Sequence, residues 1–585
     1  MSNGQTFVDD LLVSVADGAI DRDGVALRWF GDGYPGARGD GRGSRVREEV
    51  TFTELVVRVE RTAAELRALG VRPGERVLFS IRPRPEGVIL CLAVIHAGGS
   101  IVFVDPGSTP ELFEARLAAA DPRWAASEAL LYAVSSGPLA RVARARGLLL
   151  PEYARLPVRH LYSGRWLPGV PRGALRVARL GGAGPADRAT SVRDSVAPQD
   201  REALVVFTSG TTSDPRAVVH TTASLGGMLG LFAQLGELRP GQRAHTDQMF
   251  LGLPAILAGG TWEIPARTPA ADPAAFARGV AGADSSFAVP ADVTALLDVV
   301  EEGRRGGVRL GPSAKGSGGS RGPAGSVEGP RVMAVGAAPV TPALMERAVR
   351  VLPETRWVCV YGATEMLPAA VVDGADKAAA GVPPGGAVTG ALATGDLIGD
   401  PLRGVTARID APDDDGVGEL VISGPSLMAG YLADLDAGRA PAAEHRTGDL
   451  ARVDDAGRLT LVGRTRDMII RGTVNIYPGL FEPRVRALPG VAEALMVGVP
   501  MDDGNERVVL VLVADRGQVG GVNLMEDTAL VRAVEPRLPG ILDHGALPDL
   551  VAEASHVPLA GRSRKPDRAA VAAAAAPLVR KSACG

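Results

Sequence analysis

The sequence has little cysteine and few aromatic residues, and neither sign of charge is in excess. Its 585 residues include three cysteines, Cys91, Cys359 and Cys584, which form no CxxC pair and no disulfide framework. A reducing, cytoplasmic location is therefore predicted. With 63 basic and 67 acidic residues the net charge is −4, so the composition supplies no basic footprint of the kind that nucleic-acid binding needs, and no nucleic-acid partner is expected.

A signal peptide and a long hydrophobic run are also missing. Residues 1–21 carry acidic side chains without the charged-then-apolar pattern of a secretory signal. The most apolar stretch, 87–104, contains His96 and Ser100, so it predicts a buried helix and a strand and no membrane span. Because a single core stops growing at roughly 250–300 residues, at least two domains are expected.

Helical and strand patterns alternate along the first part of the chain. Apolar spacing predicts a helix over 51–70, a strand over 77–81, a helix over 86–97 and a strand over 101–104. This alternation predicts an α/β fold in which parallel-rich sheets are flanked by helices.

Two composition changes suggest how the chain is divided. The Gly/Ser-rich stretch at about 303–330 predicts a flexible surface loop rather than a boundary. The boundary is placed at 463, which gives a large N-terminal domain (1–463) and a small α+β C-terminal domain (464–585).

The strongest candidate for chemistry is the segment 205–219, in which a buried strand runs into a hydroxyl-rich loop and then, we expect, a helix. Polyphosphate needs hydrogen-bond donors on a segment that can approach it closely. Gly210 permits that approach, and hydroxyl groups come from Thr208, Ser209, Thr211 and Thr212. Such a loop taken by itself can equally be a polar turn. It is not the GxxxxGK[ST] phosphate loop, which the chain lacks.

Four further motifs follow in order: Tyr361-Gly-Ala-Thr-Glu365, His445-Arg-Thr-Gly-Asp-Leu450, Gly463-Arg-Thr-Arg-Asp467 and Gly561-Arg-Ser-Arg-Lys565. Each alone reads more simply as a helix cap, a turn or a surface lysine. Together with 205–219 they resemble the adenylate-forming superfamily of acyl-CoA synthetases, aryl-CoA ligases, luciferases and peptide-synthetase adenylation domains. The resemblance covers nearly the whole chain.

That resemblance implies ATP and Mg²⁺ as cofactors and assigns roles to individual residues. Tyr361 lies along the adenine, Glu365 holds Mg²⁺ together with Thr211, and Asp449 accepts the ribose hydroxyls. The implied catalytic residues are Lys565, Thr364 and Glu365. The implied nucleotide contacts are Thr208, Ser209, Gly210, Thr211, Thr212, Arg216, Gly336, Tyr361, Gly362, Asp449 and Arg464. Arg466 and Asp467 form the hinge of a mobile C-terminal domain.

Four positions depart from the family pattern. Ser213 and Arg216 stand where glycine and lysine are usual, and the planar guanidinium of Arg216 does not place its charge as an ammonium does. Thr473 replaces a frequent glycine on the route of the pantetheine thiol, which weakens the case for coenzyme A. No histidine directly follows Phe250; the segment instead begins with His245.

The acyl pocket is expected to be hydrophobic. Its implied substrate contacts are Phe250, Leu253, Trp262, Gly336 and Ala363, and no charged residue recurs among the lining segments. A hydrophobic acyl chain is therefore favoured over an amino acid.

The implied reaction converts a carboxylic acid and ATP into an acyl-adenylate and pyrophosphate, and then transfers the acyl group to a thiol of coenzyme A or a carrier protein. An alternative is a β-lactone synthetase that cyclises a 3-hydroxy acid. Bacterial enzymes of that kind are similar at Val104-Asp-Pro-Gly107, Arg165-Trp166 and Tyr361–Pro368. A second alternative is a non-catalytic relative that binds nucleotide or acyl chain, against which the retention of Glu365, Asp449 and Lys565 argues.

Overall fold

The computed structural model describes residues 5–31, 46–104, 110–137, 139–145, 150–180, 196–208, 216–305, 329–380, 395–464, 467, 469–471, 474–476, 478–501, 506–514, 524–542, 546–560 and 565–583. The chain forms two compact units. The first comprises Met1–Gly336, Glu346–Pro368 and Ser423–Ala443, and the second comprises Ala337–Met345, Ala369–Ile422 and Glu444–Gly585. Residues well before 463 thus belong to the unit that contains the C-terminus, and the domain boundary at 463 stays a prediction.

One sheet of the first unit is parallel except at its edge. The strand order is β14 (Arg356–Ala363), β13 (Val332–Val335), β12 (Ser285–Ala288), β10 (Arg243–His245), β11 (Thr261–Ile264), β1 (Val25–Phe30) and β2 (Val46–Thr51). Only β1 and β2 pair antiparallel within this series.

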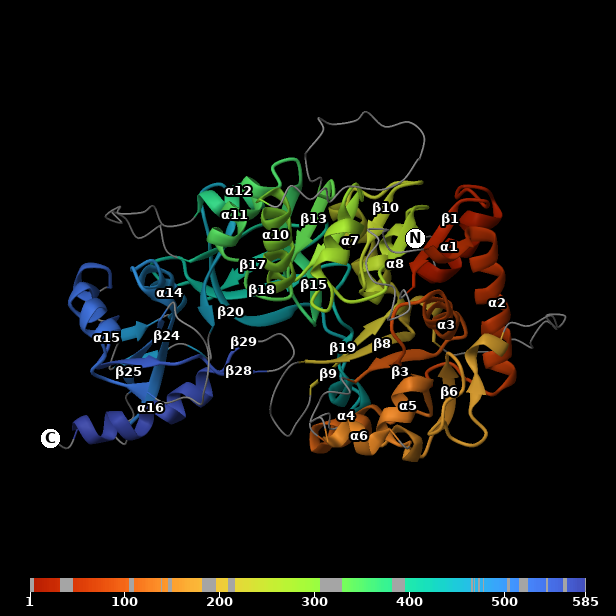
Figure 1. Ribbon diagram of the computed structural model, residues 1–585, viewed down its shortest axis with the longest axis horizontal. Helices are drawn as coiled ribbons and strands as arrows, with labels where there is room; N and C mark the ends of the chain where they lie inside the picture. Colours follow the sequence, from red (N-terminus) through yellow and green to blue (C-terminus); the bar gives the residue numbers. More distant parts are fainter. Residues whose placement is uncertain are drawn as a thin grey trace. The chain divides into compact units, whose positions relative to one another are not determined.

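The other sheet of this unit carries the hydroxyl-rich segment. Its order is β19 (Gly430–Tyr431), β9 (Ala217–Thr221), β8 (Glu202–Phe207), β4 (Ser100–Phe103), β3 (Arg76–Ser80), β5 (Trp124–Glu128), β6 (Arg159–Ser163) and β7 (Leu175–Arg176) (Figure 1). The strands from β8 to β7 are parallel, whereas β9 pairs antiparallel with β8 and with β19.

The helices of the first unit form where capping residues precede amphipathic or fully apolar runs. In α2, for example, Thr51 and Glu54 form a reciprocal capping box, and Leu55, Val59, Ala63 and Leu66 are buried at helical spacing. The helices are α1 (Phe7–Ala16), α2 (Phe52–Ala68), α3 (Pro85–His96), α4 (Pro110–Ala120), α5 (Ala129–Ser135), α6 (Ala140–Ala145), α7 (Thr222–Leu235), α8 (Met249–Leu257), α9 (Pro273–Val280), α10 (Pro290–Arg305), α11 (Pro342–Val351, which extends into the second unit) and α13 (Leu432–Asp436).

These elements confirm the predicted α/β class and the alternation predicted over 51–104. Helix α3 is buried on nearly all sides, which explains its uniformly apolar sequence. In the part of the chain that is described, no helix combines the length and the apolarity needed to cross a membrane.

The second unit contains two larger sheets and two strand pairs. The first sheet has the order β17 (Thr406–Asp410), β18 (Gly418–Ser423), β20 (His445–Val453), β21 (Leu459–Arg464), β16 (Asp396–Pro401) and β15 (Met366–Asp373). The second has the order β24 (Val491–Pro500), β25 (Glu506–Ala514), β27 (Leu550–Ala554) and β26 (Leu524–Met525). The strand pairs are β22 (Ile469–Arg471) with β23 (Val474–Ile476) and β28 (Leu559–Ala560) with β29 (Lys565–Pro566).

Helices cover both faces of the β24–β25–β27–β26 sheet. Because side chains alternate along a strand, Leu495 and Val497 pack with Val571 of α16 (Arg568–Ala583), whereas Met496 packs in a separate cluster with Val485 of α14 (Pro478–Arg486). The remaining helices of the unit are α12 (Gly374–Ala379) and α15 (Ala529–Val534).

A buried ion pair connects α14 to the first residue of α16. Arg568 donates from Nη1 and Nη2 to the two carboxylate oxygens of Glu482, at 2.6 and 2.9 Å. Glu482 also accepts from the backbone N–H of Met496 at 2.7 Å, and the Nε of Arg568 lies 3.5 Å from Asp467. The start of α16, three residues after Lys565, is therefore fixed to the residue predicted as the hinge.

The variant Glu482→Gln is expected to destabilise this region by roughly 1.5–3 kcal/mol, because the half-buried Arg568 guanidinium loses its charged hydrogen-bond acceptor and keeps only the more distant Asp467 as a countercharge. The free energy of local opening, measured by amide hydrogen exchange in β24 and α16, reports this change. Glu493→Gln, at an exposed position on β24, is the control. Equal protection in the two variants would contradict the assignment.

Candidate functional site

The hydroxyl-rich loop itself lies outside the described residues, and with it Ser209, Gly210, Thr211 and Thr212. Its two ends are described: Thr208 follows β8 and donates its N–H to the carbonyl of Arg216, at 3.0 Å. Beyond Arg216 the chain does not enter a helix as expected, but returns as strand β9, with Ala217 opposite Phe207. The β-branched run at Val218 and Val219 favours a strand, and α7 begins only at Thr222.

The turn Thr364–Glu365 connects β14 to β15 and is held against β9 by a buried histidine. The Nε2 of His220 lies 2.9 Å from the carbonyl oxygen of Thr364. Because a carbonyl can only accept, Nε2 carries the proton and Nδ1 accepts from the hydroxyl of Ser224, at 3.3 Å. Burial lowers the pKa of His220, which keeps the ring neutral near pH 7.

The Glu365 side chain is held by Tyr431 of β19, the strand that pairs with β9. The hydroxyl of Tyr431 donates to Oε1 of Glu365 at 2.8 Å, and the N–H of Met428 donates to the Glu365 carbonyl at 2.8 Å. Burial, followed by the nearby Glu365 carboxylate, raises the pKa of Tyr431 to about 12. Tyr431 is therefore a protonated donor at neutral pH.

The structure thus brings several predicted residues into one region of the first unit. Arg216 lies with its Cζ 5.4 Å from the centre of the Tyr431 ring, so the end of the loop, Tyr431 and Glu365 form a continuous series of contacts. Tyr361, Gly362 and Ala363 are the last residues of β14, immediately before this turn. Gly336 packs so closely that an added Cβ would lie 3.0 Å from the carbonyl oxygen of Val360.

The remaining predicted residues lie in the second unit. Asp449 of β20 is buried and lies opposite Arg464 of β21 in the strand register. Asp467 contacts Arg568, whereas Arg466 and Thr473 lie outside the described residues. Lys565 begins β29, where its backbone lies opposite Ala560. The convergence of Thr211, Glu365 and Asp449 on one nucleotide stays a prediction, as does the catalytic role of Lys565.

A small cavity lies beside the segment predicted to contact the acyl chain. Its volume is about 20 Å³, roughly enough for one water-sized occupant. Aromatic, aliphatic and hydroxyl side chains from α7, α8, β10, β12 and β13 surround it: Phe232, Leu235, Gly236, Leu238, Ala244, Thr246, Leu251, Pro254, Ser285, Ser286, Phe287 and Ala334.

The three predicted aromatic and aliphatic substrate contacts lie near this cavity but are not among its lining residues. Phe250 packs edge-on against Phe103, with 5.7 Å between ring centres. Leu253 is buried. Trp262 is fully buried, with its indole N–H bonded to the carbonyl of Thr246 at 2.8 Å. Their predicted substrate role remains untested.

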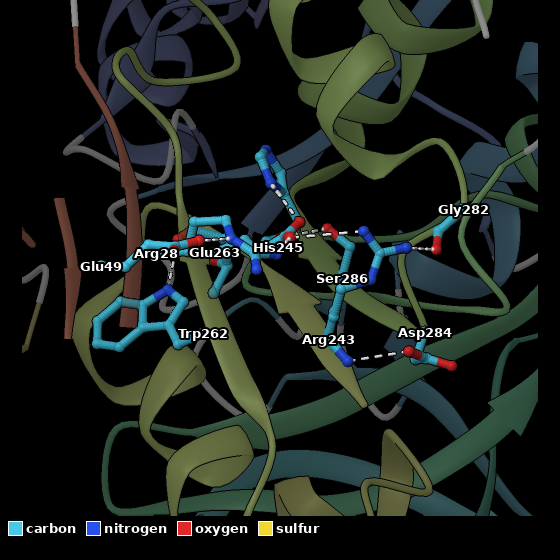
Figure 2. Close-up of polar contacts among 10 residues, drawn as sticks. Arg28, Glu49, Arg243, His245, Trp262, Glu263, Gly282, Asp284 and Ser286 are labelled. Carbon is cyan, nitrogen blue, oxygen red and sulfur yellow. Dashed lines mark hydrogen bonds and ion pairs between the residues drawn. The ribbon is translucent and has the colours of Figure 1, made fainter. Parts of the chain in front are cut away.

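His245 and Glu263 are both buried and lie within the cluster of charged side chains that Figure 2 shows. The two sequence neighbours of His245, Ala244 on β10 and Thr246 directly after β10, line the cavity, so the alternation of side chains directs the imidazole to the opposite face. There Nδ1 lies 3.9 Å from Oε2 of Glu263, and Glu263 accepts from Arg28 at 2.8 Å and from Arg243 at 3.5 Å. Because its ring points away from the cavity, His245 does not take the place of the histidine that the family pattern has directly after Phe250.

Sequence reasoning missed three residues of this region. His220 follows three apolar residues in β9, Ala217, Val218 and Val219, and a buried histidine after such a run is a usable signal. Tyr431 of β19 lies outside the five motifs that carry the family resemblance. Arg116 of α4 is buried, stacks near Phe207 and approaches the carbonyl of Thr208 at 3.5 Å; nothing in its sequence context marks it.

Burial lowers the pKa of His245 to about 4 from 6.5, which predicts an acid-sensitive fold. The unfolded chain binds this proton below about pH 6.5 and the folded chain does not, so stability falls as pH drops from 6.5 to 4. The loss attributable to His245 approaches about 3 kcal/mol. In His245→Leu, urea unfolding should show a correspondingly flatter decline over this range. Parallel pH profiles for variant and wild type would contradict the prediction.

The sequence model of a family described as AMP-binding enzyme matches residues 40–432. The chain is 27% identical to an olefin beta-lactone synthetase from Xanthomonas campestris over 566 residues, covering 90% of this chain and 91% of that protein. It is 29% identical over 77% of its length to 3-[(3aS,4S,7aS)-7a-methyl-1,5-dioxo-octahydro-1H-inden-4-yl]propanoyl:CoA ligase from Mycobacterium tuberculosis, of which 81% is covered.

Among solved structures, the chain resembles the amide bond synthetase McbA from Marinactinospora thermotolerans. The TM-score is 0.67 at 22% sequence identity, and the match covers 97% of this chain and 98% of that one. ATP-bound MatB from Rhodopseudomonas palustris gives a TM-score of 0.68 at 20% identity, covering 98% and 100%. At these identities the likeness establishes the fold.

Proposed function

The chain belongs to the AMP-binding, adenylate-forming enzyme family, and from this premise we propose that it activates a hydrophobic carboxylic acid with ATP and closes the product to a β-lactone. The first half-reaction gives an acyl-adenylate and pyrophosphate. The single observation that carries the proposal is how the Thr364–Glu365 turn is held. His220 of β9 contacts the Thr364 carbonyl, and Tyr431 contacts both Glu365 and Arg216, the residue at the end of the hydroxyl-rich loop.

In the first half-reaction the chain mainly supplies position and charge. The carboxylate of the acid attacks the α-phosphorus and pyrophosphate leaves. Thr364 contacts the α-phosphate, Arg216 offsets phosphate charge, and Lys565 bridges the substrate carboxylate and the α-phosphate. Asp449 holds the ribose hydroxyls. Hydrogen bonds from His220 and Met428 hold the Thr364–Glu365 backbone in place.

Glu365 fits a divalent cation. Mg²⁺ is usually bound by one or two carboxylates together with substrate phosphates. Glu365 offers such a carboxylate, oriented by the Tyr431 hydroxyl on the strand next to the loop. When bound, Mg²⁺ neutralises phosphate charge.

In the second half-reaction the 3-hydroxyl oxygen of the activated acid attacks its own acyl carbon. A C–O bond forms, the bond from that carbon to the phosphate oxygen breaks, and AMP and the hydroxyl proton leave. Support comes from the olefin beta-lactone synthetase relative, which matches over 90% of this chain.

Transfer to a thiol, for example of coenzyme A, is the second candidate. The Mycobacterium tuberculosis CoA ligase, matched over 77% of this chain, supports it. Thr473, where the family often has glycine on the thiol route, favours the lactone.

A 3-hydroxy fatty acid, ATP and Mg²⁺ are expected to give pyrophosphate, AMP and a β-lactone in the absence of coenzyme A, as identified by mass spectrometry. The matched control is the same acid without its 3-hydroxyl, which should be adenylated but not cyclised. Formation of a CoA thioester in place of lactone would favour the second candidate. No pyrophosphate release with any acid would favour a non-catalytic relative.

Lys565→Ala should suppress pyrophosphate release while ATP binding persists.

We further propose that the acyl chain extends toward the small cavity beside Leu251 and Pro254, and this placement predicts how acid preference can be changed. Phe287 lines it and packs against Phe232 with ring centres 6.3 Å apart. In Phe287→Ala the kcat/KM for an acid one or two carbons longer, relative to the original acid, should rise roughly tenfold. Phe276→Ala is the control, because Phe276 is equally buried but packs near His245 on the other face. The same change of preference in both variants would contradict a role for this cavity.

A further inference from the structure

In the proposed site Glu365 binds the cation, so the direction in which its carboxylate points determines how well it can coordinate Mg²⁺. A carboxylate can rotate about its last side-chain bonds, and each rotation points different lone pairs toward a metal. Here the Tyr431 hydroxyl donates to Oε1 at 2.8 Å. Because an ionised carboxylate can only accept a hydrogen bond, the Tyr431 hydroxyl is the donor in this contact.

Tyr431 is itself held from two directions. Its backbone lies in β19, opposite Val218 of β9, and the adjacent Ala429 N–H donates to the carbonyl of Val219 at 2.8 Å. The guanidinium of Arg216 lies 5.4 Å from its ring centre, within the range of a cation–π contact. A planar guanidinium stacks on a ring in a way that a lysine ammonium does not.

Resting on the proposed function, we propose that Tyr431 is a positioning residue for the divalent cation. Its hydroxyl fixes the direction in which Glu365 presents its carboxylate to Mg²⁺, and Arg216 holds the Tyr431 ring. The arginine that departs from the family's usual lysine thereby acts on the cation site through the ring as well as on phosphate through its charge.

The test is Tyr431→Phe, which removes the hydroxyl and keeps the ring. ATP affinity is measured by calorimetry with excess Mg²⁺ and again with EDTA, and the ratio of the two gives the enhancement by magnesium. We expect this ratio to fall about tenfold, as for the loss of one hydrogen bond to a charged group, with affinity in EDTA unchanged. Mn²⁺ binding in the presence of ATP, followed by EPR, should weaken in parallel. An unchanged ratio and unchanged Mn²⁺ binding would overturn the proposal.

Tyr132→Phe is the matched control. It makes the same chemical change in the same unit, where the hydroxyl contacts His160 Nδ1 at 3.0 Å, away from Glu365. Its magnesium enhancement should equal that of the wild type. An equal fall in both variants would mean that loss of a tyrosine hydroxyl acts through general stability, which would also overturn the proposal.

Arg216→Lys tests the second contact. Alone it should lower the magnesium enhancement, and in the Tyr431→Phe background it should lower it no further, because the connection to Glu365 is already broken. Full additivity of the two changes would remove Arg216 from the proposal. These outcomes are separable from failure of the proposed function, since wild-type protein that forms acyl-adenylate while Tyr431→Phe keeps its magnesium enhancement refutes the positioning role alone.

Discussion

The carbonyl of Thr364 is hydrogen-bonded by a buried imidazole 144 residues earlier in the chain, and the candidate site depends on where that imidazole lies. His220 reaches Thr364 only because β9 keeps its register with β8 on one side and β19 on the other. A shift of one residue would turn His220 to the opposite face of the sheet. The same shift would separate Tyr431 from Glu365 and Arg216 from the Tyr431 ring.

A comparable constraint operates in the second unit. Glu482 binds Arg568 through both carboxylate oxygens and also accepts from Met496, so α14, β24 and the first residue of α16 share one buried polar network. Lys565 stands three residues before Arg568, and Asp467 lies 3.5 Å from the same guanidinium. A residue predicted to move with the hinge and the segment predicted to carry the catalytic lysine are therefore coupled mechanically through one arginine.

Local patterns in the sequence were enough to predict the elements over 51–104 and the parallel-rich class, because helix caps, apolar periodicity and glycine turns act over a few residues. The same local approach predicted a helix after the hydroxyl-rich loop, where β9 forms. The segment 217–221 is short and mostly apolar, so its own sequence does not distinguish a strand from a helix. It forms a strand by pairing with β8 and β19. The contacts of Glu365 with Tyr431 and of Glu482 with Arg568 join residues too distant in sequence for any spacing rule. The placement of Ala369–Ile422 in the second unit has the same origin.

The residues around Arg216 explain what arginine can do at this position that the family's usual lysine cannot. An ammonium would offset phosphate charge as a compact, strongly hydrated group, with no preferred plane. A guanidinium keeps that charge, and here its Cζ lies 5.4 Å from the centre of the Tyr431 ring, within the range of a cation–π contact. Because the hydroxyl of that ring is bonded to Glu365, the position of the cation at 216 and the direction of the carboxylate become linked. Arginine in place of lysine at 216 therefore keeps the positive charge but adds a contact with Tyr431, and through Tyr431 a connection to Glu365. This effect of the substitution depends on Tyr431 being present on β19.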